Sequence, residues 1–301
     1  MHGHGAVRPK TEGEGTMGDA SRYAERRARF RALHESGCFV LPNPWDVGGA
    51  RYLADLGFAA LATTSAGFAF SRGRPDGSVP LDRVLAHIRE MVEATPLPVN
   101  TDFEDGYAAD LGELARNVRR CVETGVAGLS IEDATGDPAR PLYPVEEAVA
   151  RVRAARRSID DTGAEVSLVG RSECFLTGHP DPLPEALRRI ASYAEAGADC
   201  LYVPGITTPG QIAAVVGAVA PKPANLLVGR PIGLTVPEIA ALGVRRISLG
   251  GALARVAWGG LARAASALRE GRFDGLEGAL GHAELDGLFA PHRHDPGATS
   301  A

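Results

Sequence analysis

The feature that most constrains the fold is an eightfold alternation of short apolar runs with longer amphipathic stretches. Apolar runs of this length are typical of buried strands, and the stretches between them have helical spacing. We expect strands over residues 38–41, 59–65, 98–102, 128–132, 166–171, 200–203, 225–228 and 246–249. We expect helices over residues 47–56, 82–94, 111–124, 145–157, 184–196, 208–219, 236–242 and 252–270, and an extra one over 21–35. Eight such units in about 250 residues predict an α/β fold of the (β/α)8 TIM-barrel type. A doubly wound open sheet is the alternative, but it usually has fewer strands.

This pattern places a single barrel domain at residues 21–290, with additional helices before the first strand and after the last. The leader at residues 1–20 is Gly-rich, and the tail at residues 291–301 is short and polar. Neither segment has a hydrophobic period, so we expect both to be disordered. Translation starts at Met1 or at Met17, and the sequence leaves that choice open.

Composition excludes several classes of protein. The net charge is −5 and no basic block occurs, which argues against nucleic acid as a partner. No apolar run reaches roughly 18 residues and no signal peptide is visible, so we expect no membrane partner and a cytoplasmic location. Four cysteines without CxxC spacing indicate neither a zinc site nor a disulfide framework. The only lysines are Lys10 and Lys222, which lie away from the expected strand ends and so disfavour Schiff-base chemistry.

Acidic residues follow two neighbouring strands at the point where each strand ends. The segment Asp102-Phe103-Glu104-Asp105-Gly106-Tyr107 ends the third expected strand, and Glu132-Asp133 ends the fourth. The carboxyl ends of barrel strands meet at one face, where these charges repel one another unless a cation compensates them. Oxygen-only ligation suits Mg²⁺, with Mn²⁺ as an alternative ion. Solvated acidic loop tips are the other interpretation, but two such clusters together favour a metal site.

Other strand ends carry groups suited to an anion. The second expected strand ends in Thr63-Thr64-Ser65-Ala66-Gly67, small residues whose backbone N–H groups would be free to bind one. Arg171 and Glu173 end the fifth strand on one face, and Asp46 follows the first. An arginine opposite a carboxylate-held metal suits a substrate with its own carboxylate. The alternative role of Arg171 is a structural ion pair with Glu173 or Glu132.

Five segments carry a resemblance to a known family. They read PNPWDVGGAR, ATTSAGFAFSRGRPDG, VNTDFEDGYA, GLSIEDATG and LVGRSECF, in this order along the chain. Over residues 25–270 the sequence resembles the isocitrate lyase and phosphoenolpyruvate mutase superfamily. The resemblance implies a Mg²⁺-dependent enzyme that acts on small 2-oxo or 2-hydroxy carboxylates through an enolate of the pyruvate type.

The resemblance also implies roles for particular residues. It assigns the metal to Asp102 directly, and to Asp76, Glu104 and Glu132 through water. It assigns the substrate pocket to the side chain of Arg171 and to residues of two loops, which are Asp46, Thr64, Ser65, Ala66 and Gly67. Family members exchange C-terminal helices between subunits, so a homodimer or homotetramer is expected.

The loop after the fourth strand departs from the family pattern. The lyase branch has a catalytic cysteine in a Lys-Lys-Cys-Gly-His loop, whereas residues 134–142 read ATGDPARPL here. The general acid or base therefore stays open, with Arg171 and Glu132 expected to take part in catalysis. The candidates are Tyr107, Tyr143, Glu173, Cys174 and His179.

These observations favour a lyase that cleaves a C–C bond by decarboxylation or by a retro-aldol step. The first alternative is P–C bond chemistry, as in a phosphomutase or a phosphonopyruvate hydrolase. The second alternative is a catalytically silent barrel that binds an acid. Decarboxylation is favoured over a retro-aldol step because loss of CO₂ forms the enolate without a protein base.

Overall fold

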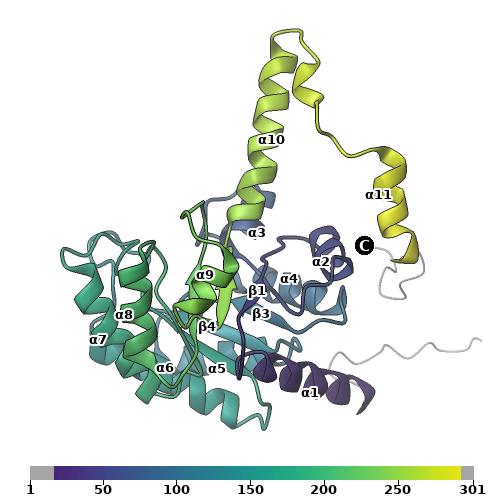
Figure 1. Cartoon of the computed structure of the whole chain (residues 1–301). Helices are drawn as coiled ribbons and strands as arrows, with labels where there is room; N and C mark the ends of the chain where they lie inside the picture. The colour runs from purple at the N-terminus through teal and green to yellow at the C-terminus, as the bar shows by residue number, and fades with distance from the viewer. Residues whose placement is uncertain (1–16, 293–301) are drawn as a thin grey trace, which may run out of the picture.

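The computed structural model describes residues 17–292, in which eight parallel strands surround a common axis (Figure 1). Their neighbour order is β1-β8-β7-β6-β5-β4-β3-β2. The N–H group of Ala62 donates to the carbonyl of Pro42 at 2.9 Å, so the two ends of the sheet meet. The predicted (β/α)8 barrel is confirmed. The strands are β1 (Phe39–Leu41), β2 (Leu61–Ala62), β3 (Val99–Asp102), β4 (Gly128–Glu132), β5 (Ser167–Arg171), β6 (Cys200–Tyr202), β7 (Ala224–Leu227) and β8 (Arg246–Ser248).

The helices pack around the barrel because each has an apolar face and a local start signal. In α5, for example, the Asp110 side chain accepts from the N–H group of Glu113 at 2.8 Å, and Leu114 and Val118 are fully buried. The helices are α1 (Met17–Ala32), α2 (Val47–Asp55), α3 (Ser65–Ser71), α4 (Leu81–Glu93), α5 (Leu111–Val122), α6 (Val145–Asp160), α7 (Pro182–Glu195), α8 (Pro209–Val219), α9 (Val236–Ala241), α10 (Ala252–Arg269) and α11 (His282–Phe289). Two 3₁₀ turns follow α10 and α11, η1 (Asp274–Leu276) and η2 (Ala290–His292).

Two predicted boundaries are wrong. The second strand does not extend to Ser65, because the Thr64 side chain accepts from the N–H group of Gly67 at 3.1 Å and so starts α3. The first helix, expected over residues 21–35, instead spans Met17–Ala32. The rest of the predicted leader, residues 1–16, and residues 293–301 of the predicted tail lie outside the described residues.

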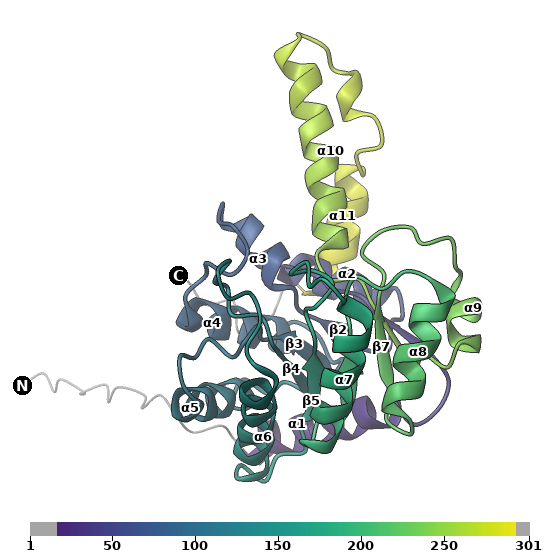
Figure 2. The same cartoon turned by 90° about the vertical axis from the view of Figure 1, so that its left-hand side faces the viewer.

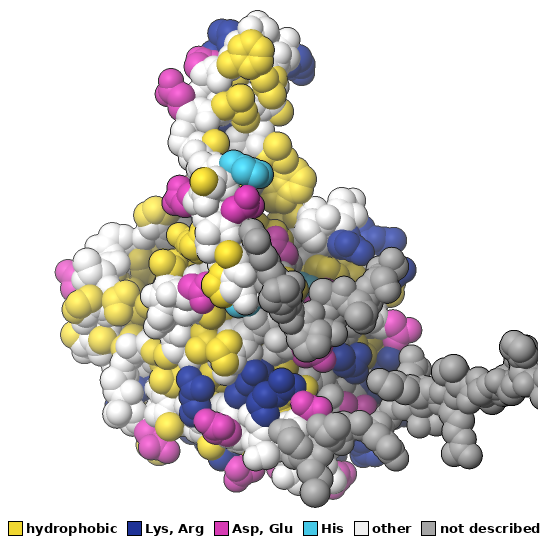
Figure 3. Space-filling model, turned by 90° about the vertical axis from the view of Figure 1, so that its right-hand side faces the viewer, with side chains coloured by type: hydrophobic (Ala, Val, Ile, Leu, Met, Phe, Trp, Pro, Cys, Tyr) yellow, Lys and Arg dark blue, Asp and Glu magenta, His cyan; other side chains and the backbone are white. Residues whose placement is uncertain are grey.

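The last two helices form a C-terminal arm, residues 252–289. Helix α10 extends away from the barrel in both views (Figures 1 and 2), and α11 returns to contact α2. Apolar side chains cover much of the arm (Figure 3). Those that are exposed are Val256, Trp258, Leu261, Leu268, Phe273, Leu276, Leu280 and Leu285. No helix among residues 17–292 is long and apolar enough to cross a membrane.

Candidate active site

The side chain of Arg171 lies at the centre of a carboxylate cluster at the C-terminal ends of β3, β4 and β5. Its Nη1 atom is 3.1 Å from Asp102 Oδ1 and 2.9 Å from Glu132 Oε2, and its Nε atom donates to Glu173. Parallel pairing places Glu132 opposite Arg171 in the sheet, which explains why groups far apart in sequence meet. The two ion pairs named as the structural alternative for Arg171 are both present, and Asp102 forms a third.

The first turn of α3 is tied to this cluster. Asp102 Oδ2 accepts from the backbone N–H of Ser65 at 3.1 Å and from its hydroxyl at 2.9 Å. The N–H of Gly67 donates to Thr64 Oγ1. The expectation that these backbone N–H groups are free is therefore wrong for Ser65 and Gly67. Gly67 itself is required sterically, because a Cβ there would lie 2.6 Å from a Thr64 side-chain carbon.

The acidic segment after β3 has a strained backbone. Glu104 and Tyr107 have φ values of +46° and +53°, which side chains with a Cβ rarely adopt. Hydrogen bonds hold this conformation: the Tyr107 hydroxyl donates to Glu104 Oε1 at 2.7 Å, and the buried Asn117 amide donates to the carbonyls of Gly106 and Tyr107 at 3.0 and 2.8 Å. These hydrogen bonds therefore fix Glu104 beside the barrel mouth despite the strain.

The carboxyl groups of the cluster resist simultaneous ionisation. Burial raises the pKa of Glu104 to about 7, and the charges of Asp102 and Asp76 add to this effect against the opposing Tyr107 hydrogen bond. Burial and then Asp102 raise the pKa of Asp76. Burial also raises the pKa of Glu132, although Arg171 acts in the opposite direction. Added positive charge at this position would relieve the repulsion.

The donor set fits a hard divalent cation in charge and chemistry, because Asp76, Asp102, Glu104 and Glu132 supply only oxygen atoms. Within residues 17–292, however, no three acidic, His or Cys side chains converge in the geometry of a formed metal site. Arg171 pairs with two of the four carboxylates instead. Two small cavities, of about 30 and 10 Å³, flank Asp102.

A buried network behind the cluster positions Glu173. Asp133 Oδ1 accepts from the N–H of Glu173 at 2.7 Å, while Oδ2 accepts from Arg189 at 3.0 Å and from the Tyr193 hydroxyl at 2.6 Å. Asp133 was expected at a strand end but without a role in the site, and no contribution was expected from Tyr202. The Tyr202 ring lies 5.3 Å from the Arg171 guanidinium. The position of Tyr202 in an expected strand, next to the one that ends in Arg171, was the available signal.

Several predicted site residues lie elsewhere. The exposed Asp46 side chain caps α2 by accepting from the N–H of Gly49 at 2.7 Å. His179 Nδ1 accepts from the N–H of Asp181 in the loop before α7. Neither Asp46 nor His179 lines the two cavities beside Asp102, and the same holds for Tyr143 and Cys174.

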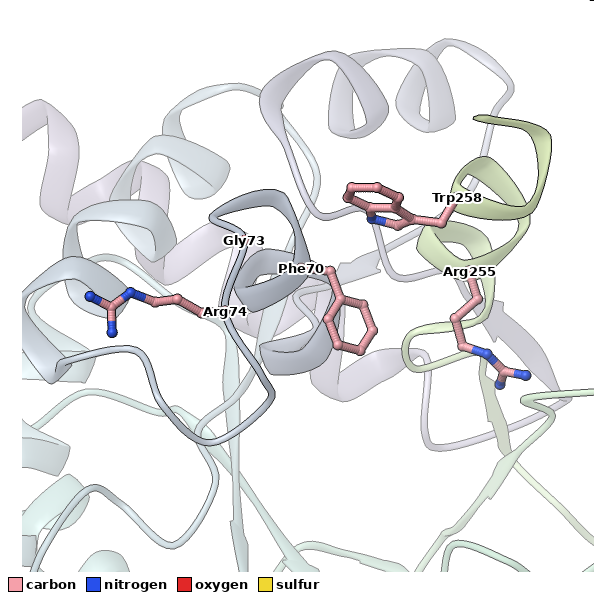
Figure 4. Close-up of a pocket in the computed structure, with 5 residues that line it drawn as sticks. All are labelled: Phe70, Gly73, Arg74, Arg255 and Trp258. Carbon is pink, nitrogen blue, oxygen red and sulfur yellow. The ribbon is translucent and has the colours of Figure 1, made fainter. Parts of the chain in front are cut away.

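A larger open pocket of about 540 Å³ lies between the end of α3 and the start of α10 (Figure 4). Phe70 and Trp258 border it from these two helices. Arg255, also on α10, donates from Nη1 to the carbonyl of Gly229 in the loop after β7 at 3.4 Å. None of the clustered carboxylates lines this pocket. This pocket is therefore separate from the Arg171 cluster.

A family model described as phosphoenolpyruvate phosphomutase matches residues 30–269, which include every member of the cluster. The chain belongs to the phosphoenolpyruvate mutase family. This confirms the resemblance to the phosphoenolpyruvate mutase and isocitrate lyase superfamily, whose members include C–C lyases, and the chain is accordingly an enzyme of that superfamily.

Individual relatives cover nearly the whole barrel. A solved structure from Burkholderia cenocepacia J2315, described only as a lyase/mutase, is 44% identical with a TM-score of 0.86, covering 89% of this chain and 98% of that chain. The oxaloacetate decarboxylase of Rhodopseudomonas palustris (strain BisB5) is 31% identical over 87% of this chain and 91% of its own length. A structure of oxaloacetate acetylhydrolase with its product oxalate is 26% identical with a TM-score of 0.78, covering 92% of this chain and 99% of that one.

In this phosphoenolpyruvate mutase family member, residues 134–142 form a closed loop above β4. Ala134 and Leu142 pair as an antiparallel bridge, and the N–H of Thr135 donates to the carbonyl of Pro141 at 3.1 Å. The loop contains no cysteine, lysine or histidine. It therefore supplies no thiol or imidazole to the site.

Proposed function

We propose that this enzyme is a divalent-metal-dependent lyase that cleaves a C–C bond of a small 2-oxo or 2-hydroxy carboxylate through a pyruvate-type enolate. The favoured reaction is decarboxylation of an oxaloacetate-like acid. The observation that carries the proposal is the guanidinium of Arg171 held among Asp102, Glu132 and Glu173 at the carboxyl face of the barrel. Mg²⁺ is the expected ion, with Mn²⁺ as the alternative.

Each group of the cluster has a role in this proposal. Asp102, with Asp76, Glu104 and Glu132, would hold the ion, and a bound Mg²⁺ would supply positive charge that stabilises the developing enolate. Arg171 would exchange a carboxylate partner for the carboxylate of the substrate, a bidentate anion of the same chemistry. The hydroxyl and the N–H of Ser65 donate to Asp102 and so keep the Asp102 carboxylate oriented.

Decarboxylation fits the chemistry that the loops provide. Loss of CO₂ forms the enolate directly, so no base is needed to begin cleavage, in agreement with the composition of residues 134–142. A proton must then return to the enolate carbon. The hydrogen-bonded pair Tyr107 and Glu104 lines the same small cavity as Asp102 and is the candidate for this transfer. The decarboxylase and acetylhydrolase relatives, by their names, act on oxaloacetate, which supports a four-carbon oxo acid.

The first experiment measures pyruvate release from oxaloacetate and from a panel of related acids, with Mg²⁺ and with a chelator. Metal-dependent pyruvate release supports the proposal. Release of free phosphate from phosphonopyruvate would instead support P–C chemistry, which needs cations around the phosphoryl group that the lysine-free loops supply poorly. No turnover of any acid would support a silent barrel.

Calorimetric titration with oxalate, a stable mimic of the pyruvate enolate, tests the site itself. We expect binding that requires Mg²⁺ and is lost in Asp102→Asn. The matched control is Asp137→Asn, an exposed carboxylate on the loop after β4 that lies outside the cluster. Binding that is indifferent to metal, or equally weakened in both variants, would contradict the assignment.

We also propose that the C-terminal arm mediates a homodimer or homotetramer. Phe273 and Val256 are 74% and 71% exposed, which is unfavourable for large apolar side chains in a monomer. Light scattering coupled to size-exclusion chromatography should show an oligomer for the wild type and a smaller species for Phe273→Asp with Leu276→Asp. A wild-type monomer at all concentrations would rule the assembly out.

A further inference from the structure

The interior of this barrel is polar and contains a buried arginine. Arg246, on β8, is 3% exposed and points into the barrel with Asn225, Ser248, Asn100 and Ser130, each of which is also buried. Barrel interiors are usually filled by branched apolar side chains. The departure therefore calls for a physical explanation.

The charge of Arg246 is not neutralised by protein. Among residues 17–292 no carboxylate lies within ion-pair distance of it, its Nε donates to the neutral Asn225 amide at 2.8 Å, and its Nη1 has no hydrogen-bond partner. Its positive charge also acts on His34, in the turn that follows α1, and after burial it is the largest cause of a lowered His34 pKa. A guanidinium left buried without a counter-charge is strongly unfavourable.

The space beside Arg246 can accept a ligand. The cavity that it lines has a volume of about 30 Å³, enough for more than one water molecule. Two donors beside Arg246 are unused: Arg246 Nη1 has no partner, and Ser248 Oγ accepts from Asn225 at 2.9 Å, which leaves the hydroxyl proton of Ser248 free. The one unpartnered acceptor is Asn100 Oδ1, so water is the competing occupant.

We propose that the barrel interior holds a halide-sized inorganic anion, such as chloride, against Arg246. The anion accepts from Arg246 Nη1 and from the Ser248 hydroxyl and neutralises the buried charge. This site lies below the Arg171 cluster along the same cavity, but it takes a permanent structural ion rather than the substrate. It is independent of which reaction the enzyme performs.

Bromide replacement tests the proposal on the intact protein. Crystals grown in bromide instead of chloride should give an anomalous difference peak within about 3.5 Å of Arg246 Nη1, because bromide scatters anomalously and binds where chloride does. Absence of a peak, with only water density in the cavity, would overturn the proposal.

Thermal unfolding provides a second, independent readout. At fixed ionic strength, a tenfold rise in chloride over gluconate should raise the wild-type Tm by about 2 °C once chloride exceeds its dissociation constant. The rise should vanish in Arg246→Met and persist in Arg245→Met, which removes the same charge from the neighbouring, partly exposed position. Equal chloride dependence in both variants would contradict an ion bound at Arg246, and if Arg246→Met does not fold, the bromide map of the wild type decides.

Discussion

Acidification should destabilise this enzyme through His87, a histidine buried beside the cluster. His87 on α4 is 6% exposed, its ring stacks on Phe68 of α3 at 3.8 Å, and its Nε2 has no hydrogen-bond partner among the described residues. Burial, assisted by the charge of Arg72, lowers its pKa from 6.5 to about 4. The folded state therefore holds His87 neutral to a lower pH than the unfolded state does.

The sign and size of the effect follow from this difference. Well above pH 6.5 the histidine is neutral in both states and its burial has no effect on the pH dependence of stability. As the pH falls from 6.5 towards 4, only the unfolded chain gains the proton, so the free energy of unfolding decreases. The loss is about 2 kcal/mol at pH 5 and approaches about 3.4 kcal/mol below pH 4. Because Phe68 belongs to α3, which carries Ser65 and its bonds to Asp102, the loosened stack should disturb the active site as well.

Urea unfolding at pH 7.5 and pH 5.0 measures this contribution in the variant His87→Phe, which keeps an aromatic ring against Phe68 but cannot be protonated. Between the two pH values the wild type should lose about 2 kcal/mol more than the variant. Other titrating groups, including His34, contribute to both proteins and cancel. The control His282→Phe changes a histidine whose side chain is 94% exposed and should behave as the wild type does. Identical pH dependence in wild type and His87→Phe would refute the argument.

Three further predictions concern the same face of the barrel. A methyl group at Gly67 would lie 2.6 Å from its nearest neighbour, so Gly67→Ala should cost about 1–3 kcal/mol in urea unfolding, whereas Gly210→Ala, with no atom within 4 Å, should cost nothing. Arg171→Lys should weaken oxalate binding by roughly 30-fold or more in calorimetry, because one ammonium cannot replace the fork of donors, while the exposed Arg140→Lys should bind normally. Asp133→Asn should lower the free energy of unfolding by about 2 kcal/mol, since it removes the buried carboxylate that pairs with Arg189 and leaves that guanidinium only its ion pair with Glu185; a loss below 1 kcal/mol would mean that this network is not strongly coupled.

Sequence patterns predicted the fold well because the strands of a parallel barrel are buried on both faces and read as continuous apolar runs. Seven of the eight expected strands lie within one or two residues of the observed ones. The exception is β2, which was expected to extend to Ser65 but ends at Ala62. Thr64 caps α3 within the same run of residues, so the helix begins where the strand was expected to continue. A cap depends on whether a hydroxyl faces a backbone N–H, and composition does not determine that.

The candidate site was predictable only in part. Residues at strand ends, such as Asp102 and Arg171, follow from the register of parallel strands, and these the structure brings together. The contribution of Tyr202 and of the Asp133 network depends on side chains from β6 and α7 that approach the cluster from behind. No spacing rule within one segment connects such groups, since their contacts are set by helix packing against the closed barrel.

The balance of charge explains why this arrangement is suited to a cation and an acid together. Arg171 pairs with three carboxylates, Asp102, Glu132 and Glu173, while Asp76 and Glu104 add negative charge without an ion pair to it. Burial raises the pKa of Asp76, Glu104, Glu132 and Glu173. If a divalent ion took over Asp102 and Glu132, Arg171 would be released from both and would turn towards an incoming carboxylate. The ion pairs of the present structure are thus consistent with substrate binding: they hold the arginine at the position where a metal would take over two of its partners and a substrate carboxylate would replace them. The strained backbone at Glu104 also suits the binding of a cation. A relaxed loop would let the Glu104 carboxyl turn to solvent, where its negative charge would be hydrated and would contribute little to holding an ion.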